Sequence, residues 1–290
     1  MGGRSRLPAP GPSSILSVFE ESFALHGERL GALAGRAHAG GDDELVHDVR
    51  VALRRLEAFA RLFRAVPGKG DGAETRAAAR DLRRRLSLLR SEEVGRALLA
   101  ARPGLAASGL DAIVFPGELP DLRIDAAEVE AVARTLDRWR RRLTSASEGA
   151  FAPRARIEDD LLRQTRRRLR NRAAELSAHL PPGRRTLHRA RIAAKKLRYA
   201  LEAVEPLDPG GRPLLRHLRT FQELAGDAHD LVELASRVRA VTATRPDPTP
   251  LLDALDADAA RAVEAARRRG AALAAPVRML RPALGRRRTR

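Results

Sequence analysis

Two stretches of the sequence carry a histidine and several cations along one side of an apolar pattern. In the stretch RTLHRARIAAKKLRYALEAVEPL, four such residues share one face of a helix: His188, Arg191, Lys195 and Arg198. The single tyrosine of the chain, Tyr199, lies on the same stripe. Because guanidinium groups form bidentate hydrogen bonds with phosphate oxygens, this face is suited to an anion that carries phosphate groups.

The stretch LVHDVRVALRRLEAFARLF repeats this arrangement 141 residues earlier in the chain. When His47 is laid on His188, the following residues match in charge and size without a gap. The first copy carries its charged stripe at His47, Arg50, Arg54 and Arg61. Arg55 and Lys196 lie to one side of the stripes, from where flexible stems could reach the same ligand. We interpret the two stretches as copies within an internal repeat.

A basic stripe on a single helix usually faces solvent. Solvated faces, however, normally mix charges of both signs as i,i+4 pairs, whereas these two stripes are nearly all positive. Burying such cations without an anion would cost several kcal/mol per ion. We therefore expect the two stripes to face either water or a polyanion.

The composition of the whole chain favours a polyanionic partner. The 290 residues include 55 Lys and Arg against 37 Asp and Glu, which gives a formal net charge of +18. Nucleic acid, an anionic membrane or a phosphate polymer could balance this charge. The lysines are Lys69, Lys195 and Lys196, so the other 52 cations are arginines.

Several classes of protein are disfavoured by what the sequence lacks. Without cysteine there are no disulfides, thiolate metal sites or cysteine nucleophiles. No apolar run approaches the length of a transmembrane helix, so no membrane partner is expected. The beginning, MGGRSRLPAPGPSS, has no apolar core after its arginines and does not resemble a secretory signal.

The secondary-structure elements that position these charged residues are predicted to be helices throughout. No stretch of the sequence alternates apolar and polar residues over the length of a strand. The fold class is therefore all-α. Ser13 or Ser14 is expected to cap the first helix, and Asp42 and Asp43 the second. The predicted helices span residues 15–37, 42–66, 72–89, 92–101, 125–145, 156–180, 184–205, 213–225, 227–244 and 248–269. A loop or short strand is expected over 102–125. With only 3% aromatic residues, the core is expected to consist mainly of Leu, Ala and Val.

Other arginines recur at helical spacing. Arg163, Arg166, Arg167 and Arg170 form an i, i+3, i+4, i+7 file on the helix before the second stripe. Such a file either faces solvent or provides a second wall for the anion site. A weaker file consists of Arg76, Arg80, Arg83 and Arg84.

The two stripes resemble the paired signature of the CHAD domain, the conserved-histidine α-helical domain. The pattern H-x-x-R-I-x-x-K-K-L-R-Y-x-x-E is intact from His188 to Glu202, and FQELAGDAHDLVEL resembles a later segment of the family. In the first half Arg90 matches the family, but Ser91 stands where an aspartate is usual. The resemblance covers residues 13–280, with repeats over about 13–148 and 149–280. Residues 1–12 are expected to be disordered, and 281–290 to form a basic tail.

The resemblance implies two pseudo-symmetric helical bundles around a basic central channel that binds inorganic polyphosphate. It also implies a cytoplasmic setting, including polyphosphate granules. The residues predicted to bind polyphosphate are His47, Arg50, Arg54, Arg55, Arg61, Arg90, Arg163, Arg166, Arg167, Arg170, His188, Arg191, Lys195, Lys196, Arg198 and Tyr199.

Two alternatives stay open. One is a nucleic-acid-binding helical protein, although few aromatics and no Asn or Gln on the marked helices argue against it. The other is a metal-dependent polyphosphate hydrolase. The sequence contains no P-loop, no G-x-G-x-x-G and no cysteine–histidine cluster. We therefore predict a binding protein without catalytic residues, bound metal or cofactor. Chain-length preference and oligomeric state do not follow from the sequence.

Overall fold

The structure is a computed structural model that describes residues 14–41, 44–63, 70–101, 113–115, 124–148, 154–242 and 249–280. These residues form nine α-helices, two short 3-10 helices and no strand, which confirms the all-α fold class. The helices are α1 (Ile15–His38), α2 (Leu45–Leu62), α3 (Asp71–Arg85), α4 (Ser87–Ala100), α7 (Ala126–Glu148), α8 (Arg154–Ser177), α9 (Leu187–Glu202), α10 (Arg212–Thr242) and α11 (Thr249–Arg278).

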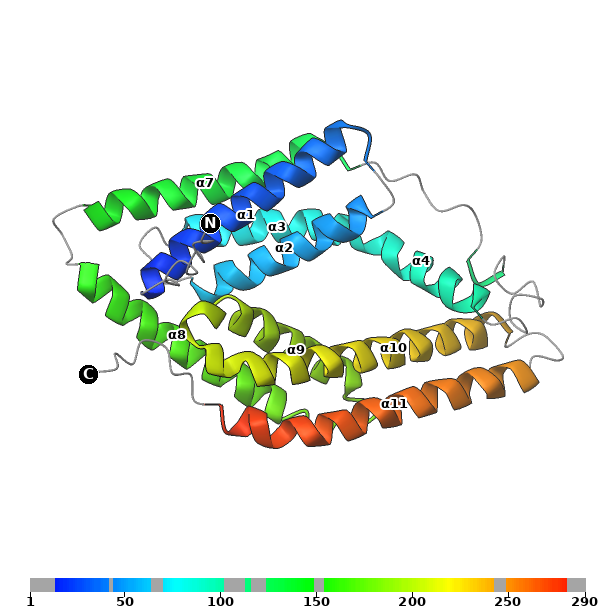
Figure 1. Cartoon of the computed structure of the whole chain (residues 1–290). Helices are drawn as coiled ribbons and strands as arrows, with labels where there is room; N and C mark the ends of the chain where they lie inside the picture. Colours follow the sequence, from blue (N-terminus) through cyan, green and yellow to red (C-terminus); the bar gives the residue numbers. More distant parts are fainter. Residues whose placement is uncertain are drawn as a thin grey trace, which may run out of the picture.

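The helices lie in two groups that meet between α2 and α9 (Figure 1). In the first group α7 lies along α1, and α3 contacts both α2 and α7. In the second group α9 packs between α8 and α10, and α11 runs beside α10. Helix α4 leaves the first group and reaches α10 in the second. How closely the two groups repeat each other's arrangement stays a prediction.

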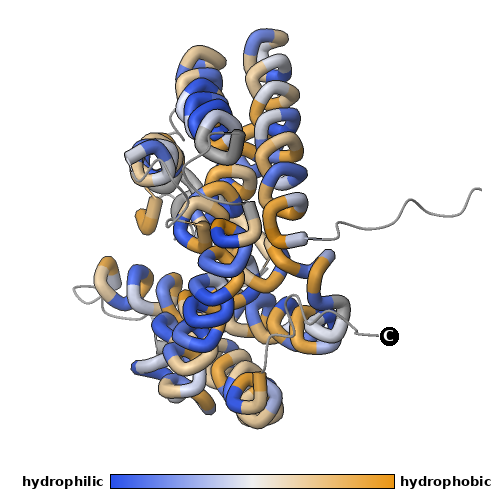
Figure 2. The backbone as a smooth tube through the Cα atoms, turned by 90° about the vertical axis from the view of Figure 1, so that its left-hand side faces the viewer, coloured by the Kyte–Doolittle hydropathy of each residue, from blue (hydrophilic) through white to orange (hydrophobic). Residues whose placement is uncertain are grey.

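The core follows the apolar stripes expected from the sequence. Apolar and polar segments alternate along the helices in Figure 2, as expected of amphipathic helices that cover a shared core. On α9 the stripe residues Leu187, Ala190, Ala194 and Leu197 are at most 2% exposed. On α2 the corresponding residues Val49, Leu53, Leu56 and Ala60 are at most 1% exposed. Burying these two stripes turns the adjacent charged stripes toward the junction of the groups.

Aromatic residues contribute more to the core than their small number suggests. One aromatic cluster lies between α1, α2 and α7, with ring centroids of neighbouring residues 4.6–5.7 Å apart. It consists of Phe19, Phe23, Phe59, Phe63 and Trp139. Each such edge-to-face or offset pair stabilises by about 0.5–1.5 kcal/mol beyond its buried area. The cluster holds α2 against α1 and α7 within the first group.

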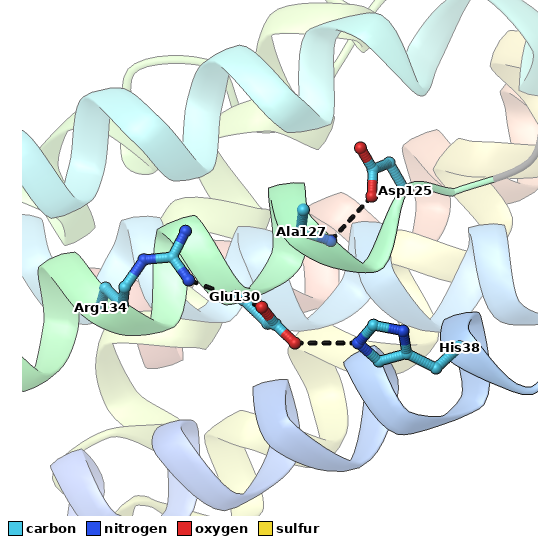
Figure 3. Close-up of polar contacts among 5 residues, drawn as sticks. All are labelled: His38, Asp125, Ala127, Glu130 and Arg134. Atoms are coloured by element: carbon cyan, nitrogen blue, oxygen red, sulfur yellow. Dashed lines mark hydrogen bonds and ion pairs between the residues drawn. The ribbon is translucent and has the colours of Figure 1, made fainter.

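Polar contacts at the ends of helices align α1 with α7. Ser14 Oγ caps α1 by accepting a hydrogen bond from the backbone N–H of Ser17, as the sequence predicts. At the other end, His38 Nε2 and Glu130 Oε1 are 2.9 Å apart, and Arg134 approaches the same carboxylate (Figure 3). Asp125 caps α7 through the backbone N–H of Ala127.

Three predicted helix boundaries were wrong, and one of them is the end of the last helix, which was expected at residue 269 although α11 continues to Arg278. The break expected near residue 90 lies at Leu86, a buried residue where α4 turns away from α3 toward α10. The helices expected over 213–225 and 227–244 are one continuous helix, α10, which runs through Gly226. A helical glycine costs about 1 kcal/mol relative to alanine. Burial of Ala225 and Ala228 against the core offsets that cost.

Some predictions fall outside the described residues. These are the disordered beginning over 1–12, the basic tail over 281–290, the caps at Ser13, Asp42 and Asp43, and most of the segment 102–125. The side chain of Arg90 is also outside the described part, although its backbone belongs to α4.

Candidate anion-binding site

A basic cavity of about 990 Å³ lies where the two groups of helices meet. Its walls come from α2 and α3 of the first group and from α8 and α9 of the second. Both predicted stripes reach it. Its cationic and imidazole side chains are Arg50, Arg54, Arg61, Arg76, Arg80, Arg83, Arg168, Arg172, His188, Arg191, Lys195 and Lys196. One carboxylate, Glu57, also lines this basic cavity among the described residues.

A smaller cavity of about 270 Å³ adjoins the basic cavity. The two share the side chains Arg50, Arg54, Arg191 and Lys195. The rest of the small cavity differs in character, because α10 contributes carboxylates and the wall includes apolar side chains. These residues are Asp230 and Glu233, and Val94, Leu98, Phe115 and Leu234. The small cavity therefore combines the four shared cations with acidic and apolar groups, and Arg237 adds a further cation to its wall.

The carboxylates near the basic cavity hold only some of its cations. Glu57 is 6% exposed and pairs with Arg83 at 2.5 Å and with Arg61 at 3.5 Å. Glu175 accepts hydrogen bonds from Lys196 Nζ at 2.6 Å and from Arg172 at 2.8 Å.

Three cations at the junction have no such partner. Within the described part of the chain, no carboxylate oxygen lies within 4.0 Å of Arg54, Arg191 or Lys195. Their positive charge is therefore uncompensated and available to an anion.

The pKa values at the junction reflect this crowding. Burial, together with the charges of Arg54, Arg191, Arg198 and Arg83, lowers the pKa of Lys195 to about 7. Burial also lowers the pKa of Arg54, although Tyr199 acts in the opposite direction through a side-chain hydrogen bond. An anion placed among these cations would favour their charged forms.

Histidine side chains line both cavities. His47 lines the smaller cavity and His188 the basic cavity, and both rings are exposed. The ring of His188 lies 4.7 Å from that of His229 on α10. Burial, followed by the charges of Arg191 and His188, lowers the pKa of His229. The two predicted histidines thus lie at the cavity walls as potential hydrogen-bond donors to an anion.

The structure brings nine of the predicted site residues to the walls of the two cavities. They are His47, Arg50, Arg54, Arg61, His188, Arg191, Lys195, Lys196 and Tyr199. Two of them are more buried than expected for residues on a charged stripe: Arg50 and Tyr199 are each only 7% exposed. Arg198 pairs with Glu202 at 3.7 Å, and its guanidinium lies 4.6 Å from the centroid of the Tyr199 ring.

Six predicted residues with described side chains line neither cavity, and Arg198 is one of them. Arg55 is exposed and lies near His26, whose pKa is lowered to about 4 by burial and by the charge of Arg55. Of the two alternatives for the file on α8, the structure favours the solvent-facing one, because none of its four arginines lines either cavity. Arg163 pairs with Asp160, Arg166 is partly exposed, Arg167 is exposed, and Arg170 borders a groove near the end of α11.

The wall on α8 is formed instead by Arg168, Asn171 and Arg172. Arg168 also donates a hydrogen bond to the backbone carbonyl of Leu62 at the end of α2. The sequence contained a signal for this face. The buried residues of α8 are Ile157, Leu161, Thr165, Leu169, Ala173 and Leu176, and Arg168 and Arg172 flank that buried stripe. Placing the arginines relative to the buried stripe, rather than to each other, would have selected the correct pair.

Neither a metal cluster nor a membrane span is found in the described ranges. No group of three or more His, Cys, Asp or Glu side chains there is close enough to hold a metal ion. Likewise, no helix that the structure describes combines the length and apolarity required to cross a bilayer.

The fold and the cavities define an all-helical protein with arginine-rich cavities where its two helix groups meet. The family model of the CHAD domain matches residues 23–239, and the chain belongs to this family. Its fold is similar to the crystal structure of the CHAD domain from the plant Ricinus communis, with 23% sequence identity and a TM-score of 0.54. That likeness covers 97% of this chain and 98% of the plant chain. No curated protein matches the sequence significantly.

Proposed function

We propose that this protein binds inorganic polyphosphate in the basic cavity without hydrolysing it. The observation that carries the proposal is the convergence of two stripes on one site. Arg54 and Lys195 occupy matched positions in α2 and α9, and both line both cavities. A linear chain of phosphates would place anionic oxygens along these side chains. Each hydrogen bond that involves a charged group contributes about 1.5–3 kcal/mol.

The shape of the site favours a slender phosphate chain over a duplex nucleic acid. The phosphates of a duplex lie on the outside of a wide helix, so a duplex would contact the rim of the basic cavity rather than its walls. The aromatic side chain of the basic cavity, Tyr199, is 7% exposed and is covered by Arg198, so it offers no free ring face for a base. A polymer without bases or sugars needs neither a groove-reading helix nor a stacking surface.

Competition binding at about 0.15 M salt tests this proposal, because salt at this level weakens non-specific electrostatic attraction. Long-chain polyphosphate and duplex DNA would be offered at equal concentrations of phosphate. We expect polyphosphate to displace a labelled polyphosphate probe at much lower concentration than DNA does. Equal competition by DNA would reduce the function to general polyanion binding.

The non-enzymatic part of the proposal has its own assay. Purified protein would be incubated with polyphosphate and Mg²⁺ or Mn²⁺, and released phosphate would be measured. We expect no release above the protein-free control, whereas release at catalytic rates would favour the hydrolase alternative. Association with cytoplasmic polyphosphate granules is part of the same proposal, and imaging of the tagged protein in polyphosphate-rich and polyphosphate-free cells tests it.

A further inference from the structure

Lys195 and Lys196 are adjacent on α9 but have opposite surroundings. Lys196 Nζ donates a hydrogen bond to Glu175 Oε1 at 2.6 Å, so this side chain has a carboxylate partner. For Lys195 the described part of the chain provides no carboxylate within 4.0 Å, although this side chain lines both cavities. The groups that act on its charge are guanidiniums, from Arg54 on α2, Arg83 on α3, and Arg191 and Arg198 on α9.

We propose that the side-chain amine of Lys195 is a site of acylation by acyl phosphates. In this step the lone pair of Nζ attacks the carbonyl carbon of the mixed anhydride. The bond between that carbon and the bridging oxygen breaks, and the phosphate leaves with the electron pair. The proton lost from nitrogen is taken up by the departing phosphate, so an amine and an acyl phosphate give an amide and hydrogen phosphate. No oxidant, reductant or metal is required.

The surroundings of Lys195 supply what this reaction needs. A lysine becomes nucleophilic when burial and neighbouring cations favour its neutral form. The pKa of about 7 at Lys195 leaves most of the amine neutral at pH 7.5, whereas an ordinary lysine is almost entirely protonated there. Arg54 and Arg191 line the same two cavities and can bind the phosphate end of the reagent. The same guanidiniums would stabilise the negative charge that develops on the leaving phosphate.

Acylation would change the site electrostatically, because an amide carries no charge. A bound polyanion could then no longer favour the charged form of Lys195, so it would bind more weakly. This consequence rests on the proposed function. The acylation itself does not, since it requires only the amine and the two guanidiniums.

The experiment uses the full chain, acetyl phosphate and mass spectrometry of the resulting peptides. At pH 7.5 we expect the initial rate of acetylation at Lys195 to exceed that at Lys196 by about tenfold or more. The rate at Lys195 should level off above about pH 8, about one unit above the pKa of its amine. With p-nitrophenyl acetate, which has no phosphate, the preference for Lys195 should decrease but persist. Equal acetylation of the two lysines by acetyl phosphate over pH 6.5–9 would overturn the proposal.

Polyphosphate added before acetyl phosphate separates this inference from the proposed function. If polyphosphate binds and slows acetylation at Lys195, it covers the junction, and both ideas gain support. If polyphosphate does not bind, or binds without protecting Lys195, the proposed function or its location is wrong. Selective acetylation in its absence would still establish the modification site.

Discussion

Arg54 of α2 and Lys195 of α9 are 141 residues apart in the sequence, yet their side chains line the same two cavities. Each comes from a stripe of cations beside an apolar stripe that is buried in the core. No described carboxylate lies within ion-pair distance of either side chain. Where these two side chains come together, the cavities carry positive charge that no described carboxylate neutralises.

Substituting Arg54→Gln and Arg191→Gln should weaken polyphosphate binding without unfolding the protein, because both side chains are only partly buried. Each lost phosphate contact should flatten the dependence of log K on log salt by about 0.7, taking the value for single-stranded nucleic acid. Titrations at several salt concentrations would measure the slope, and circular dichroism would check folding. Arg50 is unsuited to this test because it is 7% exposed, so its loss would also perturb packing.

Arg163→Gln is the matched control, since Arg163 is an exposed arginine that pairs with Asp160 and lines neither cavity. It should leave the affinity nearly unchanged. A loss equal to that of Arg54→Gln would mean that overall charge, rather than the basic cavity, determines binding.

Polyphosphate affinity should fall as pH rises above about 7. The free protein loses the Lys195 proton near pH 7, whereas a bound polyanion raises the pKa of that amine, so binding takes up a proton above pH 7. Between pH 7.5 and 9 the dissociation constant should rise severalfold, with a limit of about tenfold per pH unit. Guanidinium groups do not generally lose their protons in this window, and burial lowers the pKa of His229 from its usual value, so His229 titrates below it.

Isothermal titration in two buffers with different ionisation enthalpies would count the protons taken up. Lys195→Arg should bind polyphosphate with a much flatter dependence on pH, because arginine does not titrate in this range. An unchanged pH profile in that variant would assign the effect to another group.

Glu57→Gln should affect stability and binding in opposite directions. Glu57 is buried and pairs with Arg83 and Arg61, so loss of its charge should lower the free energy of unfolding by about 1–3 kcal/mol. The charge of Glu57 would then no longer compete with phosphate for the two arginines, and affinity should increase severalfold, equivalent to roughly 1 kcal/mol. Urea unfolding and polyphosphate titration on the same sample would measure both effects. Weaker binding by a folded Glu57→Gln protein would contradict the proposed role of the basic cavity.

Replacing two helical glycines with alanine should have opposite effects on the stability of the protein. A Cβ at Gly270 of α11 would lie 2.5 Å from Pro182 Cδ, so Gly270→Ala should destabilise by about 1–3 kcal/mol through overpacking. A Cβ at Gly226 of α10 meets no atom within 4 Å, so Gly226→Ala should stabilise by up to about 1 kcal/mol. Thermal unfolding of the two variants gives the comparison. A destabilising Gly226→Ala would show that this glycine has a role other than helix formation.

Local patterns in the sequence determined the all-α class, the buried stripe of α9 and the cations of both charged stripes. Such patterns suffice because a helix turns 100° per residue, so spacing alone assigns each residue to a face. The aromatic cluster could not be predicted in this way, because Phe19, Phe59 and Trp139 come from three helices whose faces meet only after folding.

Tertiary packing decided which of the many arginines share a cavity. Arg167 and Arg168 are neighbours in the sequence, but only Arg168 lines the basic cavity, because the buried stripe of α8 fixes the rotation of that helix. The pairing of Glu57 and Glu175 with some cations, and the absence of a described partner for Lys195, also depend on which helices adjoin. Sequence spacing specifies the faces of individual helices, whereas the distances between charges on different helices arise only when those helices pack.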